Sequence, residues 1–174
     1  MGLGSIAAVS DAGPLIHLAE IGCLSVLAVF DRLHIPEAVC LEASKHKGKA
    51  FLKQILGLGN AERHSLPQSK VSRFIHENDL EKLDFGEREC LYLCVKIGTP
   101  VLLTDDMAVR EAAKVLHVTP VGSLGAVVRA YRMNQVSLPE AERYISDLHA
   151  ISSLFVTRAI VDLALEQLHR YSDL

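Results

Sequence analysis

Tryptophan is absent from the 174-residue sequence, and aromatic residues of all kinds make up only 5% of it. Long apolar runs are missing too. None approaches the roughly 18 residues that a membrane-spanning helix requires, so we expect no membrane association. The first eleven residues lack the cationic start and long apolar stretch of a secretory signal. These absences predict a cytoplasmic location.

A strong positive charge is also lacking, because the formal net charge is −3 at pH 7. This balance argues against binding of nucleic acid by bulk electrostatic attraction. It leaves open a local basic patch, or a metal ion that offsets phosphate charge.

Several sequence signatures of reactive or metal-binding sites are missing. The four cysteines form no CxxC or Cys/His zinc spacing, and we interpret them as reduced core thiols of a cytosolic protein. No Gly-rich phosphate loop is present, and no Ser-His-Asp or Cys-His set has a clear context. The cysteines lie in segments that look helical: Cys23, Cys40, Cys90 and Cys94.

The apolar share of 49% and the chain length suit one globular domain with a substantial core. Short apolar runs alternate with helical periodicity, which predicts an α/β fold with a parallel sheet and helices on both faces. We predict an α/β unit over residues 1–135 and a C-terminal helical extension, 136–174, packed on it. The expected strands are 6–10, 33–35, 101–104 and 118–121. The expected helices are 14–20, 23–30, 36–44, 50–57, 69–77, 85–96, 107–116 and 124–133, with two more that start at Pro139 and after Thr157.

Acidic residues follow the expected strands at two points. Asp11 ends the first apolar run, and Asp105 and Asp106 end the run 101–104. Glu87 lies in the first turn of the helix 85–96. In such a fold the carboxyl ends of the strands and these helix starts share one rim, where ligands bind. Acids gathered there would suit a hard divalent cation.

Each acid also has an ordinary structural interpretation. Asp11 precedes a Gly-Pro turn, Asp106 can cap the helix 107–116, and Glu87 completes a capping box with Asp84. Asp105 still needs a reason to lie beside Asp106, because adjacent carboxylates repel each other. The other glutamates, such as Glu37, Glu89 and Glu111, are expected to be solvated helix residues.

A basic run, Lys45-His46-Lys47-Gly48-Lys49, directly follows Glu42. Glu42 lies roughly 9 Å along its helix from Pro36, so it reaches the rim only if the helix leans across it. Taken alone, the run is a solvated loop. Beside a metal site, Lys45, Lys47 and Lys49 could hold a phosphodiester backbone. Arg110 could assist them or pair with Asp106.

An ordered set of segments resembles the PIN-domain nucleases, and more closely a PIN-like branch of the VapC-type proteins. The resemblance covers nearly the whole chain, although no single segment is decisive. The matching segments are Val9-Ser10-Asp11-Ala12-Gly13-Pro14-Leu15-Ile16, Ile35-Pro36-Glu37-Ala38-Val39 with Glu42, Leu83-Asp84-Phe85-Gly86-Glu87-Arg88-Glu89, Leu103-Thr104-Asp105-Asp106, Arg110, Ala113, Val121-Gly122-Ser123-Leu124-Gly125 and the tail 155–168.

This resemblance implies a short parallel sheet in a three-layer sandwich and a divalent-metal-dependent ribonuclease, the toxin of a toxin–antitoxin pair. Carried over by position, the catalytic acids are Asp11, Glu42, Glu87 and Asp105, with Asp106 as a further metal ligand. Glu89 remains an alternative for the third acid. The implied cofactor is Mg²⁺ or Mn²⁺, and the implied partners are RNA, an antitoxin protein and a second copy of the chain.

Two other classes of protein combine an α/β pattern with such acids or such a fold. A phosphoacceptor receiver domain would carry its acidic pair after the first strand and a single Asp later, whereas this sequence has the reverse order. A non-catalytic RNA- or protein-binding module of PIN-like fold stays open, because Gly13 stands where many relatives carry Ser or Thr.

Overall fold

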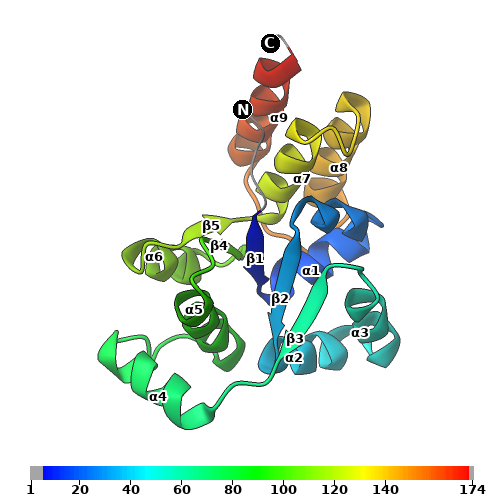
Figure 1. The fold of residues 1–174 in the computed structure, drawn as a ribbon. Helices are drawn as coiled ribbons and strands as arrows, with labels where there is room; N and C mark the ends of the chain where they lie inside the picture. The colour runs from blue at the N-terminus through cyan, green and yellow to red at the C-terminus, as the bar shows by residue number, and fades with distance from the viewer. Residues whose placement is uncertain (1–5, 173–174) are drawn as a thin grey trace.

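Five short strands form one sheet at the centre of the computed structural model, which describes residues 6–172. All four pairings between neighbouring strands are parallel, and the order is β3-β2-β1-β4-β5. Parallel neighbours need a crossover connection, which helices supply here. The strands are β1 (Ala7–Ser10), β2 (Arg32–Pro36), β3 (Ala61–His64), β4 (Val101–Leu103) and β5 (Thr119–Val121) (Figure 1).

Helices flank this sheet and extend beyond one end of it. Helix α5 packs against β1, β2 and β4, whereas α7 contacts α1 and the 3-10 helix η1. Helices α7, α8 and α9 pack together at the end of the molecule opposite α2 and α4 (Figure 1). The helices are α1 (Ala12–Glu20), η1 (Leu24–Val29), α2 (Glu37–Lys47), α3 (Lys49–Leu56), α4 (Gln68–Glu77), α5 (Phe85–Ile97), α6 (Met107–Val115), α7 (Ser123–Arg132), α8 (Leu138–Ala150) and α9 (Arg158–Ser172).

The predicted fold class, a parallel α/β sandwich with additional C-terminal helices, is confirmed. The proposed division of the chain at residue 135 stays a prediction.

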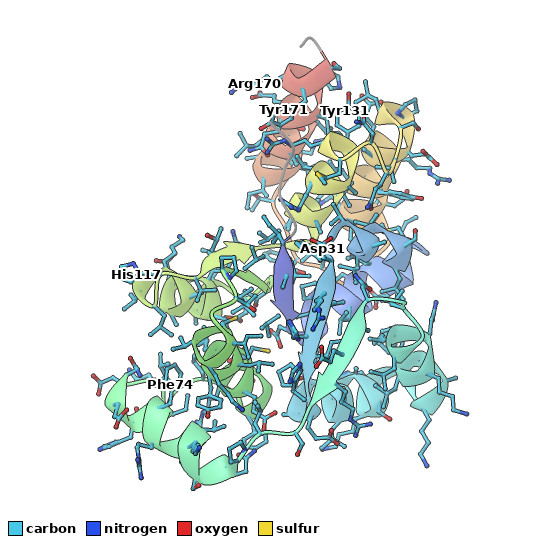
Figure 2. The ribbon with its side chains drawn as sticks, in the orientation of Figure 1. Asp31, Phe74, His117, Tyr131, Arg170 and Tyr171 are labelled. Atoms are coloured by element: carbon cyan, nitrogen blue, oxygen red, sulfur yellow. The ribbon has the colours of Figure 1, made fainter. Side chains whose placement is uncertain are left out.

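Two aromatic contacts hold outer helices against their neighbours. Phe74 on α4 points toward α5, where its ring meets Tyr92 edge-on with centroids 5.6 Å apart (Figure 2). The guanidinium of Arg132 on α7 lies 4.1 Å from the ring centroid of Tyr171 on α9, a cation–π contact (Figure 2).

The core combines the buried sides of the helices with strand residues that are buried on both faces of the sheet, as is usual for a parallel sheet. Ala8 and Val9 of β1, Leu33 of β2 and Leu102 of β4 are fully buried. The four cysteines are buried and unpaired, as expected. Across residues 6–172, none of the helices has both the length and the apolar character needed to cross a bilayer.

Strand β3 is the element that the sequence did not predict. Its residues, Ala61-Glu62-Arg63-His64, lie between two expected helices in a stretch interpreted as loop. β3 is an edge strand with a single neighbour, and none of its four side chains is buried. Backbone pairing with β2 therefore holds it in the sheet without an apolar pattern that a sequence could reveal.

Smaller differences concern helix type and bounds. The segment expected as a helix over 23–30 forms a 3-10 helix, Leu24–Val29. Helix α1 begins at Ala12 and not at Pro14, because Asp11 caps it. The predicted capping box of α5 is confirmed, and Gly98, with a left-handed backbone, ends the helix.

Glu89 on α5 is buried, so the expectation of a solvated side chain is wrong. Only 1% of it is exposed, and both of its carboxylate oxygens accept hydrogen bonds. The backbone N–H of Ala38 donates to Oε2 (3.0 Å), and the side-chain amide of Gln68 donates to Oε1 (2.6 Å). Glu89 therefore joins the first turns of α2 and α4 to α5.

We predict that Glu89→Ala lowers the free energy of unfolding by about 1–3 kcal/mol, since the Ala38 N–H is left buried without an acceptor. Urea unfolding followed by circular dichroism measures this change. Glu111→Ala is the control, because Glu111 is exposed on α6 and pairs only with Lys114. Equal effects of the two substitutions would contradict the structural role of Glu89.

Candidate active site

The pairing of β1 with β4 brings Asp11, which follows β1, and Asp105, which follows β4, to one edge of the sheet. Ser10 is in register with Leu103, and the N–H of Asp11 donates to the Leu103 carbonyl (2.9 Å). Asp11 therefore leaves the sheet beside Thr104 and Asp105, although 93 residues separate it from Thr104.

Asp11 is buried, with 8% of its surface exposed. Its Oδ1 accepts the N–H of Ala12 (2.8 Å), and the hydroxyl of Thr104 lies 3.3 Å from Oδ2. Burial raises the pKa of Asp11 to about 7, and the negative charges of Glu42 and Glu87 add to this, although the Ala12 N–H opposes it. Asp11 is thus both the cap of α1 and the centre of an acidic group.

Glu42 reaches this group because α2 packs against α5. Its Oε2 lies 3.2 Å from the position that a Cβ on Gly86 would occupy, so the carboxylate rests on the first turn of α5. A side chain at position 86 would crowd it. The lean of α2 on which the Glu42 prediction depended is therefore present.

Glu87 fills the capping role, whereas its role as a metal ligand stays a prediction. Its Oε2 accepts the N–H of Asp84 (2.8 Å), which completes the capping box. Burial raises its pKa, the nearby charges of Asp106, Asp84 and Glu42 do so further, and the Asp84 N–H opposes them. Glu89 has both oxygens engaged with Ala38 and Gln68, so Glu87 is the α5 acid that faces Asp11.

Asp105 is held by groups that the sequence reasoning did not identify. Oδ1 accepts the N–H of Ser123 (2.7 Å), Oδ2 accepts the Ser123 hydroxyl, and Nδ1 of His17 lies 2.8 Å from Oδ2. Gly122 is the N-cap residue of α7, which begins at Ser123 and not at residue 124 as predicted. A Cβ on Gly122 would lie 2.9 Å from Oδ1, so a side chain at position 122 would displace this carboxylate.

A weak sequence signal existed for these partners. Ser123 lies two residues past the last predicted strand, which places it at the same rim as Asp105. His17 lies six residues past Asp11 and carried no comparable signal, because its contact with Asp105 spans 88 residues.

Asp106 mainly caps α6. Its Oδ1 accepts the N–H groups of Ala108 (2.8 Å) and Val109 (3.0 Å). Arg110 donates from Nη1 to the Thr104 carbonyl (3.2 Å), and the salt bridges found within residues 6–172 do not include the expected pair with Asp106. Arg110 therefore lies on the Asp105 side of the site.

The basic run is helical and not a loop. Helix α2 continues through Lys47, Gly48 turns the chain with a positive φ of 86°, and Lys49 begins α3. Lys47 pairs with Glu20 (2.9 Å). Lys45 and Lys49 are exposed, so they are the lysines of this run that stay available to an anion.

The chemistry of these donors fits a hard divalent cation, since all of them are carboxylates. A buried Asp11 with two acidic neighbours is a group that a cation would stabilise. No three of these carboxylates bring ligand atoms within 4.8 Å of one another in the described part of the chain. Rotation of the long Glu42 and Glu87 side chains would have to close that gap around an ion.

A family model described as a PIN domain matches residues 7–170, so the chain belongs to the PIN-domain family. The family inferred from the sequence is confirmed. The PIN domain is in general a nuclease fold that binds divalent metal ions. A search of curated proteins found no match. The assignment to the VapC-type branch stays a prediction.

We predict that the metal-free protein loses stability as the pH rises from about 4 to 7. Folded Asp11, with a pKa of about 7, keeps a proton that an unfolded chain has already released above a pKa of about 3.9. The loss is at most about 1.4 kcal/mol per pH unit, and Glu87 acts in the same direction.

Asp11→Asn removes this titration, so its free energy of unfolding should depend less on pH over the same range. Urea unfolding of both proteins in EDTA, compared at about pH 5 and 7, measures the two slopes. Identical slopes would show that the pKa of Asp11 is not raised.

Proposed function

We propose that this protein is a divalent-metal-dependent endoribonuclease in which Asp11, Glu42, Glu87 and Asp105 hold one or two Mg²⁺ or Mn²⁺ ions, with Asp106 beside them. The observation that carries the proposal is Asp11 at the carboxyl edge of the sheet, where burial, and after it the charges of Glu42 and Glu87, raise its pKa. A buried acid among acids stabilises a fold poorly, but it binds a cation well.

The bound ion would supply an activated water and offset the negative charge that develops on the scissile phosphate. The residues of the chain position the acids for this role. The Ala12 N–H and the Thr104 hydroxyl orient Asp11, and Asp84 orients Glu87 through its N–H. A Ser, Cys or His nucleophile is not required.

Substrate contacts are proposed for cationic side chains near these acids. Lys45 lies one helical turn past Glu42, and Lys49 begins the next helix. With Arg110 they would hold the RNA backbone without reading its bases. Lys47 was predicted for the same role, but it forms a salt bridge with Glu20.

We further propose that the protein acts as the toxin of a toxin–antitoxin pair and as a homodimer. Exposed apolar side chains on and beside α8 and α9 support an interface there. Phe155 is 94% exposed, and Ile151, Ile160 and Leu163 are also exposed. Such side chains gain free energy when a second protein surface covers them.

A non-catalytic RNA- or protein-binding module is the second candidate, and one observation favours it. Both oxygens of Asp105 already accept hydrogen bonds from Ser123, and His17 lies against one of them. A carboxylate engaged in this way has fewer lone pairs left for an ion.

We predict that Asp11→Asn abolishes Mn²⁺-dependent cleavage of a mixed RNA pool while the protein stays folded. Asn keeps the shape and the capping oxygen of Asp but removes the charge that binds the ion. Gel analysis of the RNA, with a melting curve for each protein, gives the result. Asp162→Asn on α9 is the control, since Asp162 is exposed and pairs only with Arg158. RNA cleavage by Asp11→Asn at the wild-type rate would disprove the assignment.

A second prediction separates the two roles of Glu87. Gln can replace Glu in a capping box but cannot bind an ion as strongly. Glu87→Gln should therefore change the melting temperature little in EDTA, yet weaken Mn²⁺ binding and cleavage. The matched control is Glu140→Gln, because Glu140 completes the same capping box with Ser137 on α8.

Isothermal titration with Mn²⁺ and the RNA assay together measure the effect of Glu87→Gln. If Glu87→Gln and Glu140→Gln behave alike in both assays, Glu87 is only a capping residue and does not bind the ion.

A further inference from the structure

A second group of potential ligands lies on β2 and β3, at the far side of the sheet from β4 and β5. His34 on β2 is in register with Glu62 on β3, and His64 follows Glu62 by two residues. Side chains two apart on a strand share a face of the sheet, so the three project from the same face. Strands hold such side chains more rigidly than loops do.

The ligand atoms of these three side chains converge. His34 Nδ1 lies 2.8 Å from His64 Nε2, and the two oxygens of Glu62 lie 3.7 Å from one nitrogen each. Within residues 6–172 this is the one group of three such residues whose ligand atoms all lie within 4.8 Å of one another. Arg32 would compete with a metal ion for Glu62, because its Nη1 lies 3.8 Å from Oε2 of Glu62.

These separations are close to those of a tetrahedral zinc site. Zn–N and Zn–O bonds of about 2.0–2.2 Å at tetrahedral angles place ligand atoms about 3.3 Å apart. The observed distances of 2.8 Å and 3.7 Å lie on either side of that value. A small opening between the imidazoles and a small approach of Glu62 would complete the geometry.

We propose that His34, Glu62 and His64 form a transition-metal site of the Zn²⁺ class, separate from the acidic site, with a fourth position open to water. Two imidazoles and one carboxylate suit Zn²⁺, whereas Mg²⁺ and Mn²⁺ favour all-oxygen sites. The partial exposure of His64 and Glu62 gives the ion a route in from solvent.

A bound ion would fasten the edge strand β3 to β2. β2 leads directly into α2, which carries Glu42, and β3 leads within four residues to Gln68, the partner of Glu89. The site would therefore stabilise the side of the molecule from which Glu42 reaches the acidic group.

The test is a titration of the metal-stripped full-length protein with zinc chloride, followed by calorimetry. Co²⁺ is the spectroscopic probe, because tetrahedral Co²⁺ absorbs visible light strongly. We expect one Zn²⁺ site per chain that depends on His64 and Glu62, with affinity at that site about tenfold or more weaker in His64→Ala and in Glu62→Gln. Both residues are at least partly exposed, so these variants should fold, and circular dichroism checks that they do.

His76→Ala is the matched control. His76 pairs with Glu81 in the same way but is exposed and lacks a second imidazole. Asp11→Asn should keep the Zn²⁺ site whether or not the protein cleaves RNA, so failure of the nuclease proposal leaves this test unaffected. Absence of Zn²⁺ binding in the wild type, unchanged affinity in His64→Ala, or loss of the site in Asp11→Asn would each overturn the proposal.

Discussion

The parallel pairing of β1 with β4 is the contact on which the acidic site depends. It buries the end of β1 and leaves the carboxylate of Asp11 in a place where its charge is poorly solvated. The acids of α2 and α5 then approach the same place, because α5 packs against β1 and β4, and α2 packs against α5. The sheet thus holds carboxylates that repel one another, and a bound cation would offset this repulsion. A chain selected for stability alone would gain by replacing Asp11 with a neutral residue.

The two proposed metal sites differ in their ligands and in their position on the sheet. Carboxylates gather where the strands end and helices begin, and oxygen ligands favour hard ions. The imidazoles lie on the face of an edge pair of strands, and nitrogen ligands favour zinc-like ions. The ion held by the carboxylates would take part in cleavage at the rim, and the ion held by the imidazoles would stabilise strands β2 and β3. Helix α2 connects them, since it starts at the end of β2 and carries Glu42.

Much of this arrangement could be predicted from the sequence, because local signals specify it. Apolar runs marked four of the five strands, and the acids Asp11 and Glu87 were placed by strand ends and a capping box. Strand β3 carried no apolar pattern, because it is an edge strand with exposed side chains. The contacts of Glu89 with Ala38 and of His17 with Asp105 join distant segments, so tertiary packing alone creates them. For the same reason the His34–His64 pair had no signal in the sequence.

The central claim is that Asp11 and its acidic neighbours bind a divalent cation. The most direct measurement is the crystal structure of the protein soaked in Mn²⁺, with anomalous scattering used to locate the ion. We expect an anomalous peak between Asp11 and Asp105, with Glu42 and Glu87 turned toward it. A soaked crystal with no peak beside Asp11 would contradict the claim.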